Sequence, residues 1–304
     1  MQPVTGHRPR PTNPLVLTPL GPFSLAASSR FLEGFAPAGY RSGDPDHLHL
    51  AFPVEGDWPT VGACVRERDG AVVATVHGDA DPGAVRAQVA RILSLDVDGS
   101  GFAAVGRRDP VIGRLQRRWP GLRPVCFWSA YEAAAWALLS HRVRITQAAA
   151  AKQRIAERLG LGVDIHGDTV TAFPAPRRLR GLTEADVPGR KLGYLLQLAD
   201  AALDGQLDSA TLRSLPRDEA LSLLRRLPGI GAFSAELVLL RGAGDPDHFP
   251  TQERRLRQAM ARLYDLRDPT AAQLTQIADS WRPYRTWASV LLRVWLEDEA
   301  QPQR

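Results

Sequence analysis

The 304-residue sequence predicts two folded parts, an α+β N-terminal domain followed by an all-α domain. Alternating apolar and polar residues in "HLHLAFPV" and "ACVRERDGAVVATVHG" are typical of strands, whereas helical patterns dominate after about residue 107. A glycine-lined corner, Pro228-Gly229-Ile230-Gly231, joins two of these helices. We expect a loose tail over 1–14, the α+β domain over 15–105 and the helical domain over 106–304.

Turn and capping residues place the elements of the first domain. Asp69-Gly70 lies between two alternating runs, a strong signal for a β-hairpin. Asp81 followed by Pro82 predicts the start of a helix, since aspartate caps a helix N-terminus and proline suits its first position.

Further helices follow from the same signals in the second part. Ser129 and Glu132 form a capping-box pattern, and a helix is expected from Thr146 to the stop at Gly160. The pattern indicates six more helices, over 189–203, 217–226, 232–241, 252–263, 269–281 and 284–297. Short connections predict a compact helical domain without a fixed-period repeat.

Composition excludes several classes of protein. The longest apolar runs are far shorter than a membrane span, and the N-terminus lacks a signal-peptide pattern, so we expect a soluble cytoplasmic protein that contacts no membrane. Cys64 and Cys126 are the only cysteines, and the sequence shows no Cys/His cluster. A disulfide framework, a zinc site and a four-thiolate iron–sulfur cluster are therefore not expected, and no cofactor is predicted.

Charge is unevenly distributed along the chain. Residues 1–105 carry a net charge of −3 and residues 106–304 a net charge of +8, from a total of +5. A basic helical domain suggests a polyanionic partner such as nucleic acid. The alternative is a general preference for arginine, since Lys152 and Lys191 are the only lysines.

The corner at Leu227 to Gly231 fits a phosphate-binding turn. Its two glycines allow positive φ and close approach of another backbone, and the first N–H groups of the next helix point outward toward an anion. A bare Pro-Gly-x-Gly is also found in ordinary turns between helices, so this reading depends on its surroundings.

Those surroundings resemble one enzyme superfamily. "LPGIGAFSAELVLLRGAGDPDHFPTQERRLRQAM" and "SWRPYRTWASVLLRVW" closely resemble the helix-hairpin-helix DNA glycosylases, of the 3-methyladenine DNA glycosylase II type. The likeness extends over roughly residues 15–298 and implies a helix-hairpin-helix glycosylase domain after the α+β domain. It assigns the grip on the DNA backbone to Leu227, Gly229, Ile230 and Gly231, with an alkali-metal ion expected at the Leu227 and Ile230 carbonyls and no catalytic metal.

The resemblance assigns catalysis to one carboxylate. The family's aspartate lies four residues after the Phe of its FP element, and Phe249 leads in this count to Glu253. The extra methylene can displace the carboxylate by about 1 Å and cost on the order of a hundredfold in rate. The helix dipole and neighbouring Arg254 and Arg255 favour a charged carboxylate. The alternatives are an exposed first-turn glutamate that only supports the helix, and Asp247 as the acid.

Phe233 stands where bifunctional relatives carry a nucleophilic lysine, so a monofunctional glycosylase without strand cleavage is expected. Its ring suits a cationic methylated base, and the resemblance adds Leu237, Trp287 and Trp295 as base-pocket candidates. Helical spacing equally allows these side chains to be core residues, as expected for Trp136.

The loop that fills the gap left by a flipped base departs from the family consensus, of which only the valine of Ser140-His141-Arg142-Val143-Arg144 remains. Candidates for the wedge are His141, Arg142 and Arg144, where arginine can stack on bases or meet a phosphate. The alternative is that these arginines are surface residues that only add positive charge.

The resulting hypothesis is a monomeric base-excision repair enzyme that acts on double-stranded damaged DNA. It hydrolyses the N-glycosidic bond of alkylated purines of the 3-methyladenine and 7-methylguanine type, after turning the nucleotide out of the stack. The alternative is a catalytically weak or inactive paralogue that binds damaged DNA, favoured by the change from aspartate to glutamate and by the altered wedge loop. The lesion spectrum does not follow from the sequence.

Overall fold

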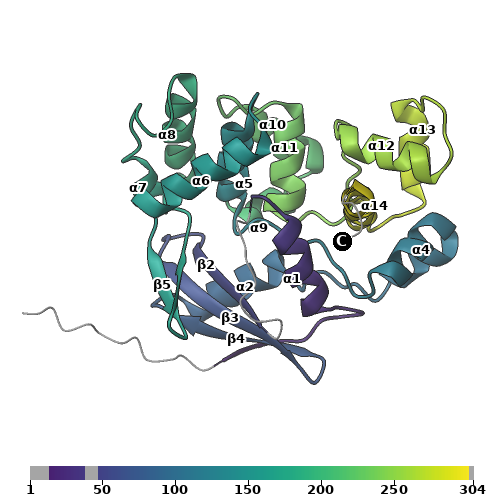
Figure 1. Cartoon of the computed structure of the whole chain (residues 1–304), viewed down its shortest axis with the longest axis horizontal. Helices are drawn as coiled ribbons and strands as arrows, with labels where there is room; N and C mark the ends of the chain where they lie inside the picture. Colours follow the sequence, from purple (N-terminus) through teal and green to yellow (C-terminus); the bar gives the residue numbers. More distant parts are fainter. Residues whose placement is uncertain (1–13, 38–46, 301–304) are drawn as a thin grey trace, which may run out of the picture.

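The structure is a computed structural model that describes residues 14–37 and 47–300 (Figure 1). All but the last residue of the tail expected over 1–14 lie outside the described residues. Within the described residues, no helix combines the length and apolar character needed to cross a bilayer. An antiparallel sheet forms one end of the molecule, and helices form the rest (Figure 1).

The N-terminal sheet has the strand order β1-β4-β3-β2. Its strands are β1 (Leu15–Leu17), β2 (His47–Pro53), β3 (Thr60–Arg68) and β4 (Ala71–His77). The hairpin predicted at Asp69-Gly70 is confirmed, since both residues have positive φ, 51° and 75°, as a tight two-residue hairpin turn requires.

Two helices cover one face of this sheet, α1 (Leu25–Gly34) and α2 (Pro82–Ile92). The predicted start of α2 is confirmed, because the Asp81 side chain accepts a hydrogen bond from the Ala84 N–H at 2.7 Å. The alternation of the strands buries Leu48, Leu50 and their counterparts on β3 and β4 against these helices.

The second part is predominantly helical. The helices predicted from the sequence are present with ends shifted by up to three residues. The structure adds four helices that were not predicted, α3 (Phe102–Arg108), α4 (Pro110–Arg118), α7 (Pro176–Leu179) and α9 (Ser209–Ser214). The predicted ones are α5 (Ala130–Ser140), α6 (Ile145–Leu159), α8 (Arg190–Leu203), α10 (Arg217–Arg225), α11 (Ala232–Leu237) with the π-helical turn η1 (Val238–Gly242), α12 (Arg254–Leu263), α13 (Ala271–Asp279) and α14 (Arg285–Ala300).

Two details of the sequence-based prediction are wrong here. The chain does not stay helical, because β5 (Gly162–Ile165) and β6 (Asp168–Thr171) form a hairpin that packs on the N-terminal sheet. A Cβ at Gly62 of β3 would lie 2.9 Å from side-chain atoms of this hairpin, so glycine allows the close approach. The capping box is also incomplete: Ser129 caps α5, but Glu132 pairs with Lys152 at 2.7 Å.

The sheet carries a group of possible metal ligands that the sequence-based interpretation did not foresee. The sequence shows no Cys/His cluster, yet strand pairing brings His47, His49 and Cys64 together with possible metal-ligand atoms within 4.8 Å of one another. The pattern is non-local because Cys64 is on the neighbouring strand. A His-x-His spacing within a strand, which places both rings on one face, is the only local sign of it.

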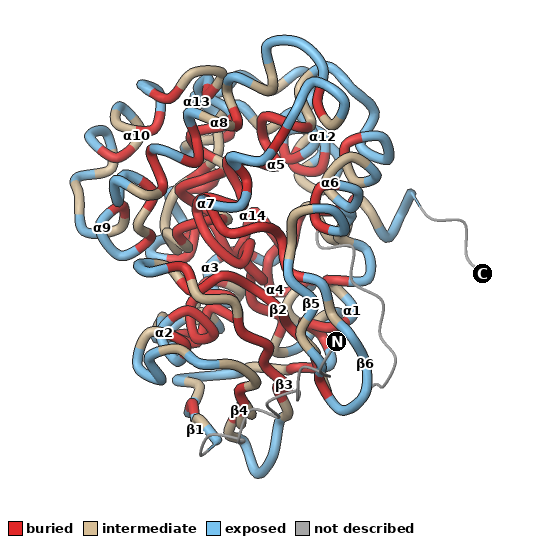
Figure 2. Tube along the Cα trace, turned by 90° about the vertical axis from the view of Figure 1, so that its left-hand side faces the viewer, coloured by how far each residue is buried: buried red, intermediate tan, exposed pale blue. Residues whose placement is uncertain are grey.

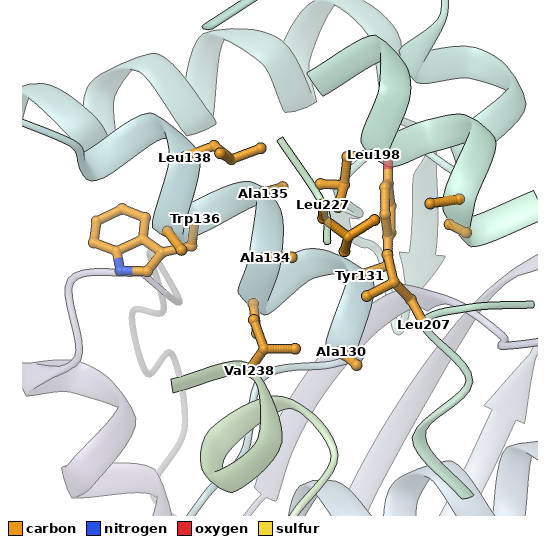
Figure 3. Close-up of a cluster of buried hydrophobic side chains, with 14 of the residues drawn as sticks. Ala130, Tyr131, Ala134, Ala135, Trp136, Leu138, Leu198, Leu207, Leu227 and Val238 are labelled. Carbon is orange, nitrogen blue, oxygen red and sulfur yellow. The ribbon is translucent and has the colours of Figure 1, made fainter. Parts of the chain in front are cut away.

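Helix α5 forms the centre of the largest core. Its residues from Ala130 to Leu139 are all buried, and Leu227 and Val238 from the hairpin region lie against it (Figure 3). Trp136 is 4% exposed, which confirms its predicted place in the core. The turn at 227–231 and the helix that follows it therefore pack on α5, whose residues are almost all buried.

A third core holds the C-terminal helices together with α3 and α4. The buried Asp109 carboxylate caps α4 and accepts hydrogen bonds from Tyr264 at 2.6 Å and from the Trp281 indole at 2.8 Å. Burial, with Asp109 adjacent, raises the pKa of Tyr264, so this phenol is a stable donor. Figure 2 shows the buried part of α14 in red, which corresponds to its first half, residues 285–292.

The Gly229→Ala variant is expected to lose roughly 1–3 kcal/mol in free energy of unfolding. Gly229 has a φ of +82°, and an added Cβ would lie 2.6 Å from Leu138 Cδ2. Gly231→Ala is the matched control, because Gly231 has a φ of −90° and its Cβ would meet nothing within 4 Å. Urea unfolding measures both, and equal losses would contradict the assignment of strain to Gly229.

Candidate active site

The turn at Leu227 to Gly231 leaves the first backbone amides of α11 without a side-chain cap. The Leu227 and Ile230 side chains are buried, and the Ile230 N–H donates to the Leu227 carbonyl at 3.0 Å, which closes the turn. Gly231 caps α11 in an extended conformation with no side-chain hydrogen bond to the first amides. Those amides are available to an anion, and a carbonyl that accepts one hydrogen bond keeps a second lone pair. The phosphate and alkali-metal roles remain predictions.

The wedge-candidate loop lies next to this helix start. His141 ends α5, and its Nε2 lies 3.3 Å from Ser234 Oγ on α11. Lys191 binds the start of this loop, because its Nζ donates hydrogen bonds to the carbonyls of Leu139 and His141 at 2.8 Å each. Arg142 is exposed and takes a φ of +53°. The structure thus brings the wedge and hairpin candidates together, although they are about 90 residues apart in sequence.

Exposed apolar side chains concentrate on these two segments. Val143, Ile145 and Phe233 are 41%, 51% and 48% exposed, and they are three of the six large hydrophobic residues exposed within the described part of the chain. Phe233 is therefore not a core residue. Clustered exposed apolar groups mark a contact surface, and the sequence-based interpretation missed Val143 and Ile145, whose apolar character was visible in the sequence.

The Glu253 carboxylate forms an ion pair with an arginine of α14. Glu253 takes the N-cap position of α12, and its Oε2 accepts a hydrogen bond from Arg293 Nη1 at 2.6 Å. Arg293 also donates to Glu297 at 2.6 Å, while its buried Nε has no partner among the described residues. The cation that pairs with Glu253 is therefore Arg293, a residue that the sequence-based interpretation did not name. Nothing near Glu253 in sequence signals a partner 40 residues away.

The tryptophans of α14 lie on other sides of this helix. Successive residues of an α-helix are rotated by about 100°, so Trp287 and Trp295 point about 120° and 160° away from Arg293. Trp287 is 2% exposed and packs against Phe102 and Tyr284. Trp295 is half-buried against the same core. The side chain of α14 that meets Glu253 is Arg293, and the base-pocket role of these tryptophans stays a prediction.

Two other carboxylates lie near the loop before α12. Asp247 binds Arg285 through Nε at 2.9 Å and through the backbone N–H at 3.2 Å, so it is committed to holding the start of α14. Glu236, on α11, is 8% exposed and accepts a hydrogen bond from Thr251 at 3.3 Å, but its Oε2 is buried without a partner among the described residues. Glu236 is a buried acid that the sequence-based interpretation missed. Leu237, beside it, is only partly buried against the central core.

A second half-buried arginine, Arg241, lies beside the Glu253–Arg293 pair. Burial lowers the pKa of Arg241, and Arg293, Glu297 and Glu253 are close enough to act on it electrostatically. Its guanidinium packs on Phe31 and Phe35, about 5 Å from each ring centroid, and donates to the Val125 carbonyl at 2.6 Å. Aromatic residues of α1 in the N-terminal domain therefore form one side of the site, and no local sequence signal indicates this.

Similar proteins identify the family of this chain. No protein-family model matches the chain. Over 199 residues it is 32% identical to DNA-3-methyladenine glycosylase 2 of Escherichia coli (strain K12), a match that covers 63% of this chain and 66% of that protein. The solved 3-methyladenine DNA glycosylase of Archaeoglobus fulgidus has a TM-score of 0.76 at 19% identity and covers 95% of this chain and 100% of that one. The chain belongs to the helix-hairpin-helix DNA glycosylases, of the 3-methyladenine DNA glycosylase II type.

The likeness reaches other branches of this glycosylase superfamily at the level of fold. The 8-oxoguanine glycosylase/lyase of Clostridium acetobutylicum, solved with double-stranded DNA, has a TM-score of 0.58 at 19% identity over 80% of this chain and 86% of that one. Membership of the superfamily accounts for the hairpin and the helical core. It does not account for the Glu253–Arg293 pair, which is an observation on this family member.

His141 is expected to make this glycosylase less stable in mild acid. Burial, then Lys191 and Arg142, lowers its pKa below the ordinary 6.5, so the folded state binds its proton more weakly than the unfolded chain does. The stability that neutral His141 contributes is present above pH 6.5 and is lost as the pH falls through the lowered pKa. Urea unfolding across this range should show a smaller loss in His141→Gln, and unchanged pH dependence would contradict the assignment.

Proposed function

We propose that this chain is a monofunctional glycosylase that removes alkylated purines from double-stranded DNA. The observation that carries the proposal is that the exposed wedge-loop residues lie beside the open start of α11, while the loop leading to Glu253 is bound to the same helix through Thr251 and Glu236. Support also comes from the similarity to 3-methyladenine glycosylases and from the net charge of +8 on residues 106–304.

DNA would contact the surface formed by the hairpin and the 141–145 loop. Backbone amides of the hairpin suit a phosphate, while Val143, Ile145 or Arg142 can fill the gap in the stack when the damaged nucleotide turns out. A nonpolar wedge from Val143 or Ile145 is a candidate that the sequence-based assignment of His141, Arg142 and Arg144 did not include. Phe233, exposed at the head of α11, offers its ring face to a cationic base.

Glu253 would act at the sugar. The N-glycosidic bond breaks with its electron pair leaving on the base, which departs as a neutral molecule because methylation had made it cationic. The carboxylate stabilises the positive charge that develops on the sugar, and a water oxygen then bonds to C1′ while its proton passes to the carboxylate or to solvent. No general acid is needed for such a leaving group.

The lysines of the chain are unsuited to strand cleavage. Lys152 pairs with Glu132 at 2.7 Å, and Lys191 donates to two carbonyls of the wedge-candidate loop. A lyase needs a free amine that attacks the sugar. These are the only lysines in the sequence, which supports hydrolysis without nicking.

The Glu253–Arg293 pair favours the second candidate function, a weak or inactive protein that binds damaged DNA. A guanidinium 2.6 Å from the carboxylate offsets the negative charge that the reaction needs. Turnover on methylated DNA distinguishes the two functions.

The wild-type protein is expected to release 3-methyladenine or 7-methylguanine from methylated duplex DNA, and Glu253→Gln to lose about a hundredfold or more of that rate because an amide cannot stabilise the sugar cation. Released base is measured by chromatography, and lesion binding by fluorescence anisotropy serves as the folding control. If both proteins bind lesion DNA and neither releases base, the binding function is correct. Nicking of abasic DNA as fast as base release would refute the monofunctional assignment.

Arg293→Gln is expected to raise the single-turnover rate of base release by about tenfold, or about 1.4 kcal/mol in the barrier, because Glu253 regains its full negative charge. Arg255→Gln is the matched control, since Arg255 is exposed and lies 3.8 Å from Glu297. A rate that falls in Arg293→Gln but not in the control would show instead that Arg293 holds Glu253 in its active position.

A further inference from the structure

A group of histidines lies on the face of the N-terminal sheet that points away from its core. In the strand register His49 of β2 is directly opposite Cys64 of β3, and His47 lies two residues before His49 on the same face. The neighbouring residues Leu48 and Leu50 point to the other face and are completely buried. Three residues that can bind a metal therefore share one small area, with their possible ligand atoms all within 4.8 Å of one another.

The β5–β6 hairpin closes over this area, and Figure 1 shows it lying along the sheet. His166 occupies its two-residue turn with a φ of 57°, and its ring centroid is 6.1 Å from that of His47 and 5.6 Å from that of His49. His77 of β4 lies on the other side of His166 at 5.3 Å. Four of the seven histidines of the chain thus meet at one place.

Two ring nitrogens of this group have no hydrogen-bond partner among the described residues. The Nε2 atoms of His49 and His77 are buried and hydrogen bond to no described residue. A buried polar atom without a partner is costly in a folded protein, which makes an unseen partner at this point reasonable.

Charge around the cluster also suits a cation. Asp168 acts on His49, and Asp164 acts on His77, each as a negative charge from the β5–β6 hairpin. Arg66, opposite His47 in the register, opposes this but is partly exposed. Two carboxylates against one arginine leave a negative environment next to the histidines and the thiol.

We propose that His47, His49, Cys64 and His166 form a binding site for Zn²⁺ or a similar divalent transition metal. Imidazole and thiolate are the ligands that zinc prefers, and three histidines with one cysteine complete a four-coordinate, closed site. His77 contacts His166 from the side, where it can orient this ring. The proposed metal site is separate from the 227–231 turn and from Glu253, and the metal takes no part in base removal.

The required rearrangement is small. Ligand atoms bound to one tetrahedral zinc are about 3.4–3.8 Å apart, as the usual zinc–nitrogen and zinc–sulfur distances dictate. The ligand atoms of His47, His49 and Cys64 now lie within 4.8 Å of one another, and rotation of these side chains brings them to this spacing. His166, whose ring centroid is 5.6 Å from that of His49 and 6.1 Å from that of His47, has to move toward them as the fourth ligand. Because His166 belongs to the hairpin inserted in the helical part, a metal here would fasten that hairpin to the N-terminal sheet.

The first test is titration of the untagged, chelator-treated protein with ZnCl₂ against a competing zinc chelator. Wild type is expected to bind one equivalent, and His49→Ala to bind at least about tenfold more weakly. His166→Asn should weaken binding similarly, while Asn-Gly keeps the tight turn that His166-Gly167 now makes. His248→Asn is the control, since His248 lies near Glu236, and it should bind like wild type.

The second test is the absorption spectrum of the Co²⁺-loaded protein. A tetrahedral site with one thiolate gives intense visible bands and a sulfur-to-cobalt charge-transfer band, and Cys64→Ser should lose the latter. Zinc should also raise the melting temperature of wild type but not of His166→Asn. Wild-type affinity equal to that of the His49→Ala and His166→Asn variants, or a Co²⁺ spectrum without the thiolate band, would overturn the site.

Discussion

The close approach of α5 to the helix after the 227–231 turn determines where the two DNA-contact candidates lie. A Cβ at Gly242 would come within 2.8 Å of Ala130 Cα and 2.9 Å of Ala133 Cβ, so only small residues allow this contact. The C-terminal end of α5 continues into the wedge-candidate loop, and the N-terminal end of α11 is the hairpin. One tightly packed pair of helices therefore presents both DNA-contact candidates at the same surface, linked by His141 and Ser234.

The charges of the site are organised as pairs rather than as one isolated acid. Glu253 and Glu297 share Arg293, Arg241 lies beside them between two phenylalanine rings, and Glu236 is buried under the loop before α12. A carboxylate held by an arginine is well positioned, because a charged hydrogen bond fixes its rotamer, but it is electrostatically weaker. The pairing with Arg293 therefore fixes the position of the Glu253 carboxylate and weakens its negative field, at the residue for which catalysis is proposed.

Local sequence signals predicted most of the helices and strands, but few of the tertiary contacts between them. Asp81, Ser129 and Asp69-Gly70 act through neighbours within four residues, and the structure confirms each of them. The β5–β6 hairpin was missed because its short strands gain stability from packing on the sheet, which no local pattern reveals. Glu253 was located by resemblance alone.

The same limit applies to the contacts of the site and of the histidine cluster. Arg293 reaches Glu253 from a helix 40 residues away, and Cys64 reaches His49 through strand register. Both contacts depend on tertiary structure, so residue type and spacing could suggest the participants but not the pairs. The exposure of Phe233, in contrast, separates two roles that helical spacing left equal.

The N-terminal part of the chain is bound directly to the elements that carry the candidate site. Arg91 of α2 donates to the Phe127 carbonyl at 3.1 Å and also to the carbonyl of Gly242, which ends the helix of the hairpin. Arg123 donates to the carbonyls of Pro22 and Ser94 at 2.9 Å each. Rotation of one part against the other would leave these buried donors and acceptors unpaired, a cost of about 1–3 kcal/mol for each group. The two parts are thus expected to move as one body, so that Phe31 and Phe35 keep Arg241 beside Glu253 while DNA is bound.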